Sequence, residues 1–381
     1  MKKIAILAFG DKSAGGIYQY TQSIIDALKD ENSNQYIIFC DMDDNRFDHY
    51  TFEVRKISIP QSTKFQKLIR AFQSMFFIRK PYFFQKKELA LFQDIDLFIS
   101  PLISAYPHFY LNKPFLFTLH DMQERYYPNY FTKKERIVRW LNNRTLAKSA
   151  VKIICESRFV KEDIVKFIGV DENKIHIIQS PPPLEFLNYH FDDAKFEDVR
   201  QKYNLPSKYL FYPAQAWFHK NHIKLIEAFK KISEEYDEIF LVLTGSQQNN
   251  FIHIMNKIKE LELSDKVKHL GYIDYEDLPY LYKMSQMLVM PSLFESVSIP
   301  IYEAFVLGVP VCSSNVVALP EQVADAGILF DPNSVDDIAE KILLLLNDDE
   351  LKNEKILKGY EKVVNFNHEE YRKKLLNVIN D

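Results

Sequence analysis

The chain has 381 residues, of which 47% are hydrophobic and 26% are charged, a composition typical of a folded globular protein. Its net charge of −4 argues against a nucleic-acid-binding protein, and the lack of any run of about 18 apolar residues argues against a membrane-spanning one. The three cysteines, Cys40, Cys155 and Cys312, have no metal-ligand spacing and favour a reducing location such as the cytoplasm.

The first half of the chain alternates short apolar segments with segments of helical period, a pattern typical of a parallel sheet covered by helices. We expect the first strand at 4–9, because this apolar run is too short for a signal peptide and no cleavage site follows it. Gly15 and Gly16 come next, and paired glycines let a loop approach a ligand closely. The other strands expected in this half are 36–40, 97–100, 115–118 and 152–155.

Residues 64–87 mix basic with aromatic side chains. Such a helical stretch suits the surface of an anionic membrane, although the aromatics can instead belong to the core while the lysines face solvent. Charge is also uneven along the chain: residues 1–180 carry +7 and residues 181–381 carry −11, which sum to −4. This asymmetry predicts different partners for the two halves. The basic residues of the stretch are Lys64, Lys67, Arg70, Arg79, Lys80, Lys86 and Lys87.

His120 follows the strand expected at 115–118. A histidine at the end of a parallel strand can hydrogen-bond a ligand and orient a second substrate, although a structural role is the alternative. Asp121 can cap the following turn.

A turn-rich connector, Ser180-Pro181-Pro182-Pro183, separates the two halves. We therefore expect one domain at 1–182 and a second at 203–360. The strands expected in the second half are 209–212, 239–244, 267–270, 287–291 and 309–313.

Lys220 lies between a predicted strand and the helical stretch 223–233, where a mobile point charge suits a diphosphate group. An ordinary surface lysine is the alternative.

Glu295 and Glu303 lie eight positions apart, with Pro300 placed to start a helix between them. The order is strand, loop with an acid, helix with an acid. In an open parallel sheet, ligands bind at the carboxyl ends of the strands, and a helix start suits phosphate. The two acids are therefore predicted to bind hydroxyls on either side of a diphosphate, as a sugar nucleotide offers. The alternative is a solvated loop acid and a capping acid.

Taken in order, several segments resemble the retaining glycosyltransferases of family 4, and the resemblance covers nearly the whole chain. The Glu295–Glu303 spacing matches that family's Glu-x7-Glu signature. The other matching segments are Gly15 to Tyr20, Thr118-Leu119-His120-Asp121, Tyr212 to His222, Gly308-Val309-Pro310-Val311, Leu319-Pro320-Glu321 and Ala326 to Pro332.

The resemblance implies the α/β fold called GT-B, with two Rossmann-like domains whose parallel sheets face a central cleft. The first domain would bind the acceptor and the second the nucleotide sugar, and a closing helix at 366–381 would cross back onto the first. The implied reaction moves a hexose from a nucleoside-diphosphate sugar to a glycan or lipid-linked acceptor, with retention and without a metal or another cofactor. The lysine and histidine segments are most similar to bacterial enzymes that use GDP-mannose to build surface polysaccharides such as O-antigen, and this favours mannose and a location at the inner face of the plasma membrane.

The resemblance assigns catalytic roles to His120, Lys220 and Glu295, with Glu295 contacting the transferred sugar and Glu303 the ribose. Further donor-binding residues that it implies are Gly15, Gly16, Gln215, Ser296, Val297, Ser298 and Ile299.

Three of these residues depart from the family pattern. Gln215 stands where many relatives have arginine, and Ser296 and Ser298 stand where they have glycine. Diphosphate stabilisation would then rest more on Lys220, with Arg158 or His219 as candidate compensating cations, and the donor preference can differ. The departures keep two alternatives open: a sugar-nucleotide epimerase on the same fold, and a non-catalytic sugar-nucleotide-binding partner protein.

Overall fold

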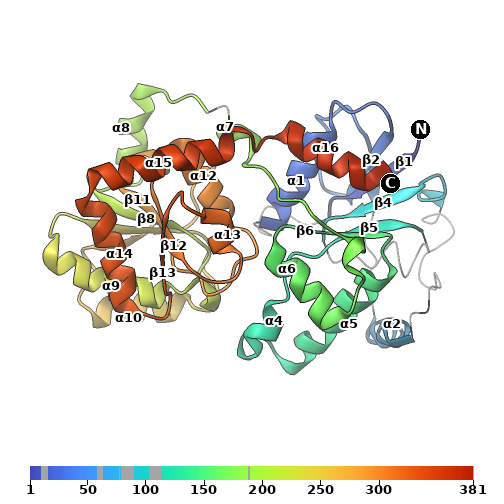
Figure 1. Ribbon diagram of the computed structural model, residues 1–381, viewed down its shortest axis with the longest axis horizontal. Coiled ribbons are helices and arrows are strands. Elements are labelled where there is room, and N and C mark those ends of the chain that lie inside the picture. The colour runs from blue at the N-terminus through green and yellow to red at the C-terminus, as the bar shows by residue number, and fades with distance from the viewer. Residues whose placement is uncertain are drawn as a thin grey trace. The chain divides into compact units, whose positions relative to one another are not determined.

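The chain folds into two compact units, Met1–Ser180 together with His368–Asp381, and Pro181–Asn367 (Figure 1). The second unit begins earlier in the sequence than the domain expected at 203–360, because two further helices, α7 (Leu184–Leu187) and α8 (Asp193–Lys202), belong to it. The computed structural model describes the chain except for residues 10–15, 58–62, 77, 79–89, 103–112, 188 and 381, and it describes only the backbone of Gln66, Lys67 and Arg70.

The first unit contains a parallel sheet of seven strands in the order β3-β2-β1-β4-β5-β6-β7. The sequence pattern missed β3 and β7, which lie at the two edges of the sheet: β3 reads Glu-Val-Arg-Lys-Ile, and β7 is only three residues long. The strands are β1 (Lys3–Leu7), β2 (Gln35–Asp41), β3 (Glu53–Ile57), β4 (Leu97–Ser100), β5 (Phe115–Thr118), β6 (Lys152–Cys155) and β7 (Ile175–Ile177).

Helices cover both faces of this sheet (Figure 1). Side chains alternate along each strand, so Ile4 and Ile6 pack on one face, with α1 and α16, while Ala5 and Leu7 pack on the other, with α5 and α6. The helices of this unit are α1 (Gly16–Leu28), α2 (Lys64–Phe76), α4 (Gln123–Tyr126), α5 (Lys133–Ser149), α6 (Arg158–Asp163) and α16 (His368–Asn380).

The C-terminal helix α16 belongs to the first unit although it follows the second in sequence, as the GT-B resemblance predicts. It packs against α1, and Tyr371 and Leu375 enter the same core as Ile24. The Nζ atom of Lys2 donates a hydrogen bond to the carbonyl of Ile379 over 3.2 Å, which fixes the helix end beside the first strand.

The second unit contains six parallel strands in the order β10-β9-β8-β11-β12-β13, all packed into one core. Its strands are β8 (Tyr209–Pro213), β9 (Phe240–Thr244), β10 (Val267–His269), β11 (Met287–Met290), β12 (Val311–Ser314) and β13 (Ile328–Phe330). Besides α7 and α8, its helices are α9 (His222–Glu235), α10 (Phe251–Glu260), α11 (Leu278–Met284), α12 (Ile299–Leu307), α13 (Leu319–Val323), α14 (Val335–Asn347) and α15 (Asp349–Val364).

Local sequence explains the position of α12. Pro300 is its second residue, where the missing N–H costs nothing, and Gly308 ends the helix with a φ of 67°. The helix that the sequence predicts after Glu295 is therefore present.

The strand order of each sheet reverses at one point, between β1 and β4 in the first unit and between β8 and β11 in the second. Ligands of open parallel sheets bind next to such a reversal, beyond the carboxyl ends of the strands. The loops that follow these four strands are where a site is expected.

Candidate active site

Lys220 and Glu295 meet at the reversal point of the second sheet. Lys220 ends a short 3-10 helix, Phe218–Lys220, after β8, and Glu295 lies on the loop after β11. Their Nζ and Oε1 atoms are 2.5 Å apart, and the side chains are 21% and 11% exposed. The structure thus joins two residues, 75 positions apart, that the sequence assigned separately to the site.

Neighbouring side chains fix the loop that carries Lys220. Asn221 adopts the left-handed conformation with a φ of 57°, and its amide donates to the carbonyls of Pro291 and Pro332 over 3.0 and 2.9 Å. The Tyr212 hydroxyl donates to the carbonyl of Lys220 over 2.8 Å. Sequence reasoning missed Asn221, although asparagine is a residue type that tolerates this conformation well.

Gln215, which follows β8, accepts a hydrogen bond at Oε1 from Trp217 Nε1 over 2.8 Å. This contact orients the amide that stands where many relatives have arginine. His219, one of the two candidate compensating cations, lies beside Lys220, and its carbonyl accepts from the Leu293 N–H over 2.8 Å. The other candidate, Arg158, is exposed at the start of α6 in the first unit.

Ser298 is buried at the start of α12, whereas Ser296, Val297 and Ile299 are half-buried. The Ser298 N–H donates to Gln322 Oε1 over 2.8 Å, and Gln322 Nε2 donates back to the Ser298 carbonyl over 2.7 Å. The Ser298 N–H is therefore engaged by the protein itself. Sequence reasoning did not identify Gln322, for which no pattern gave a signal.

Glu303 is only 3% exposed, and its carboxylate faces α11, where Tyr282 donates its hydroxyl proton to Oε2 over 2.6 Å. Burial raises the pKa of Glu303 to about 7, although the hydrogen bond from Tyr282 acts in the opposite direction. Of the two acids in the Glu-x7-Glu signature, one is therefore in an ion pair and the other is in a buried hydrogen bond.

In the first unit, His120 lies just beyond β5, and both of its ring nitrogens have partners. Nδ1 is 3.1 Å from Glu156 Oε2, and Nε2 is 2.7 Å from the carbonyl oxygen of Pro101. The ring of Tyr20 packs edge-on against the imidazole at 4.7 Å. Burial lowers the pKa of His120, but the hydrogen bond and charge of Glu156, with smaller contributions from Pro101 and Asp121, together raise it above its usual value.

Asp121 caps the next turn, a role that the sequence analysis allowed for it. Its Oδ1 accepts the N–H of Gln123 over 3.0 Å and pairs with Arg139 over 2.9 Å. Gly16 is the exposed first residue of α1, and a Cβ built on it meets nothing within 4 Å. Gly15 lies outside the described residues.

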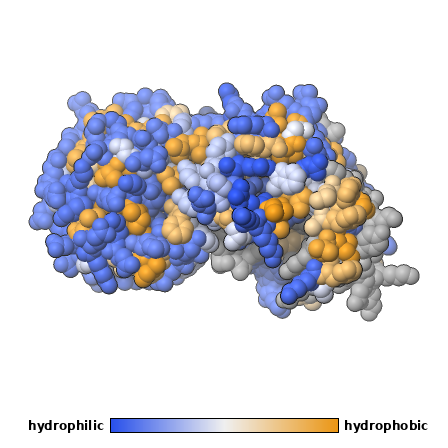
Figure 2. Space-filling model, turned by 90° about the horizontal axis from the view of Figure 1, so that it is seen from below, coloured by the Kyte–Doolittle hydropathy of each residue, from blue (hydrophilic) through white to orange (hydrophobic). Residues whose placement is uncertain are grey.

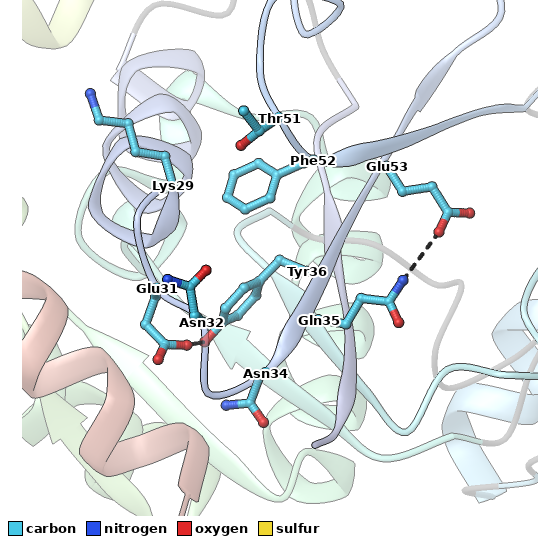
Figure 3. Close-up of a pocket in the computed structure, with 9 residues that line it drawn as sticks. All are labelled: Lys29, Glu31, Asn32, Asn34, Gln35, Tyr36, Thr51, Phe52 and Glu53. Atoms are coloured by element: carbon cyan, nitrogen blue, oxygen red, sulfur yellow. Dashed lines mark hydrogen bonds between the residues drawn. The ribbon is translucent and has the colours of Figure 1, made fainter.

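A polar pocket of about 430 Å³ lies elsewhere on the first unit, lined by the α1–β2 loop and the starts of β2 and β3 (Figure 3). These are the amino ends of the strands, the edge of the sheet opposite to His120. Several of its polar groups pair with one another, as when Tyr36 donates to Glu31 and Gln35 to Glu53. This pocket is therefore separate from the candidate site.

Among the described residues, no group of three or more His, Cys, Asp or Glu side chains is arranged to hold a metal ion. Within the same part of the chain, no helix has the length and apolar character needed to cross a bilayer.

Two family models match the chain in tandem. The model for Glycosyltransferase Family 4 matches residues 14–185, and the model for Glycosyl transferases group 1 matches residues 195–362. O-antigen chain mannosyltransferase B of Escherichia coli is 30% identical over 270 residues, which cover 69% of this chain and 70% of that protein. O-antigen chain mannosyltransferase RfbU of Salmonella typhimurium is 27% identical over 220 residues, which cover 57% of this chain and 56% of that protein.

Solved structures match the whole chain. HepE of Anabaena, solved in complex with UDP and glucose, superposes with a TM-score of 0.77 at 16% identity over 100% of both chains. A glycosyltransferase of Rickettsia africae gives a TM-score of 0.72 at 18% identity over 99% of this chain and 97% of the other. At these identities the two structures establish the GT-B fold alone. The E. coli relative and the two family models show that the chain belongs to glycosyltransferase family 4.

Proposed function

We propose that this glycosyltransferase is a retaining, metal-independent hexosyltransferase that transfers mannose from GDP-mannose to a glycan or lipid-linked acceptor in the synthesis of a surface polysaccharide such as O-antigen. The observation that carries this proposal is the Lys220–Glu295 ion pair at the reversal point of the second sheet. The choice of mannose rests on the relatives, which are named as O-antigen mannosyltransferases.

Each site residue has a role in this proposal. Lys220 stabilises the negative charge that develops on the departing diphosphate, a largely electrostatic contribution. Glu295, already paired with that lysine, contacts the transferred sugar, and Glu303 binds the ribose hydroxyls. His120 of the first unit hydrogen-bonds the donor sugar and orients the acceptor, which attacks from the face that the diphosphate leaves.

The chemistry is tested with the purified chain and a panel of sugar nucleotides that includes GDP-mannose, UDP-glucose and UDP-N-acetylglucosamine. We expect transfer from GDP-mannose to a lipid-linked glycan acceptor, unchanged by EDTA, and an α-linked product by NMR, because the donor is itself α-linked. If the donor were epimerised without transfer, the protein would be an epimerase. If it neither transferred sugar nor hydrolysed the donor, it would be a non-catalytic binding partner. An inverted product, or a loss of transfer in EDTA, would each overturn part of the proposal.

Lys220→Ala tests the residue on which the mechanism most depends. We expect turnover to fall about 10²- to 10³-fold, as when one preorganised donor to a developing charge is removed. Lys224→Ala is a matched control, because Lys224 lies on α9 and pairs with Glu227 rather than with a site residue. Near-normal turnover of Lys220→Ala, with wild-type circular dichroism, would exclude Lys220 from the mechanism.

We also propose that α2 holds the enzyme at an anionic membrane, the place where a lipid-linked acceptor is presented, on the cytoplasmic side. The buried side chains among those described on α2 are polar, Gln73 and Ser74, and the Ser74 carbonyl accepts from Thr145 of α5 over 3.0 Å. Several apolar side chains of α2 are exposed, and Figure 2 shows a hydrophobic patch over this helix. The exposed apolar side chains of α2, each 57–70% exposed, are Phe65, Leu68, Phe72, Met75 and Phe76.

Charge near this patch supports an anionic partner. The sequence of α2 itself contains three basic residues and no acidic one. Anionic lipid attracts each such residue by about 1 kcal/mol near the surface. Residues 77 and 79–87 of the stretch that the sequence assigned to membrane contact lie outside the described chain.

A further inference from the structure

A buried carboxylate lies behind the histidine of the first unit. Glu156 directly follows β6, which pairs with β5, the strand that precedes His120. The Glu156 side chain is 7% exposed. Its Oε2 atom is 3.1 Å from His120 Nδ1. Neither composition nor motif spacing drew attention to Glu156, because the contact joins two loops 36 residues apart.

The second nitrogen of His120 determines what this contact means. Nε2 lies 2.7 Å from the Pro101 carbonyl, and a carbonyl oxygen only accepts, so Nε2 carries a hydrogen. The 3.1 Å contact at Nδ1 then needs one more proton between the ring and Glu156. Either the ring is an imidazolium facing a carboxylate, or a neutral ring faces a carboxylic acid.

The other partners of Glu156 favour the carboxylate. Ser180 donates its hydroxyl to Oε1 over 2.6 Å, and its N–H lies 3.4 Å from the same oxygen. Hydrogen bonds donated to a carboxylate stabilise its charged form. If His120 is an imidazolium, both oxygens receive donors, one from Ser180 and one from His120, and this arrangement suits an ionised acid.

Among the described residues, the other titratable groups around the pair are two tyrosines, a cysteine and Asp121, which itself pairs with Arg139 over 2.9 Å. Tyr20 and Tyr371 are buried nearby, and burial raises the pKa of each well above its usual value, so both stay neutral. Cys155 precedes Glu156 and points its thiol toward the Ser157 carbonyl. Asp121, next to His120, adds a further negative charge.

We propose that Glu156 is a positioning residue that keeps His120 as an imidazolium. The Nε2–H of this ring donates to the Pro101 carbonyl and can donate to a ligand oxygen instead. This inference rests on the proposed function, in which His120 contacts the donor sugar. A cationic donor of fixed direction binds a hydroxyl or phosphate oxygen more strongly than a neutral ring does.

Ring NMR of Glu156→Gln tests the inference without any activity. Histidine is labelled with ¹⁵N, long-range ¹H–¹⁵N correlations report the protonation of each nitrogen, and His120 is assigned by its absence from His120→Asn. We expect the wild-type ring to be doubly protonated at pH 7 and the variant ring to be neutral with hydrogen on Nε2, since the glutamine amide can donate to Nδ1. Glu162→Gln, at an exposed position on α6, is the control and should keep the wild-type ring state.

Kinetics then separate positioning from a merely structural role. We expect Glu156→Gln to lower kcat/KM at pH 7 by at least about tenfold, which is part of the 10²- to 10⁴-fold rate enhancement that a positioned acid–base group contributes. The pH profile of kcat/KM should also move to lower pH. The effect should vanish when His120 is already alanine, because Glu156 acts through that ring.

Two results would overturn the inference: an unchanged ring state in Glu156→Gln, or an equal loss of activity with and without His120. If the wild type transfers no sugar at all, the proposed function fails, but the ring state still decides whether Glu156 sets the charge of His120. The two failures are therefore distinguishable.

Discussion

Lys220 and Glu295 stabilise each other's charge, so a variant at either position affects two side chains. Both are largely buried, and removing one partner leaves the other without its counter-charge. A loss of activity in a single variant therefore combines a lost ligand contact with a disturbed neighbour. Comparing both single alanine variants with the double variant separates these contributions.

Glu303 should make the second unit less stable as pH rises. Its folded-state pKa is about 7, against a usual value of 4.5, so between these pH values the native state holds a proton that the unfolded chain has lost. The free energy of unfolding should therefore fall by roughly 3 kcal/mol from pH 4.5 to above pH 7, at 1.36 kcal/mol per pKa unit. Glu303→Gln cannot ionise, and its melting temperature should lose this dependence.

Tyr282→Phe and Glu350→Gln are the controls for that measurement. The Tyr282 hydroxyl lowers the pKa of Glu303, so removing it should shift the stability loss to higher pH. Glu350 is exposed at the start of α15 and should leave the profile unchanged. Identical pH profiles for the wild type and Glu303→Gln would contradict the expected effect of burial.

At the scale of elements, Gly245 sets how closely the end of β9 approaches the loop after β8. Its φ is 112°, and a Cβ there would lie 2.6 Å from the Ala214 carbonyl oxygen and 2.8 Å from the Gln215 nitrogen. Gly245→Ala should destabilise the second unit by about 1–3 kcal/mol in denaturant unfolding and displace the Gln215 loop. Gly271→Ala, with a φ of 72° and open space around its Cβ, should cost less; an equal cost would show that the close approach is unimportant.

The outward face of α2 should govern binding to lipid. Changing Phe72 and Phe76 to serine should weaken co-sedimentation with phosphatidylglycerol vesicles at low salt, since both side chains are 57% exposed and contribute little to the core. Wild-type binding should also weaken as salt rises. Tyr272→Ser, at a 72% exposed position of the second unit, is the control. No wild-type binding at low salt would end the membrane proposal.

At the scale of the whole molecule, α16 makes the first unit depend on the last residues of the chain. Leu375 is fully buried against α1 and the sheet, in the core that also contains Ile24 and Leu28. Leu375→Ala should cost about 2–5 kcal/mol, and calorimetry should show a lower melting temperature for the first unit alone. Lys374→Ala, at the exposed neighbouring position, should change neither transition. If both units melted earlier together in Leu375→Ala, α16 would not belong to the first unit alone.

The sequence could predict the α/β class because parallel strands buried on both faces have a recognisable local pattern of residues. Apolar runs such as Phe115–Thr118 and Met287–Met290 are short, continuous and followed by loops. Edge strands have a weaker sequence pattern: Glu53–Ile57 is partly exposed and mostly polar, and Ile328–Phe330 is only three residues long. Their pairing with a neighbouring strand, rather than their composition, makes them strands.

The sequence by itself determined the fold class, the order of the site motifs and the residue types at Lys220, Glu295 and His120, because strand period and motif spacing are local properties. Only the tertiary structure decided that Lys220 pairs with Glu295, that Glu303 hydrogen-bonds to Tyr282 and that Glu156 faces His120. These contacts join residues 75, 21 and 36 positions apart. The parallel sheets bring the first and third pairs together by setting the loops after neighbouring strands side by side at one edge, and the packing of α11 against α12 brings Tyr282 to Glu303. Charge, burial and pKa depend on those neighbours, and no local pattern of residues specifies them.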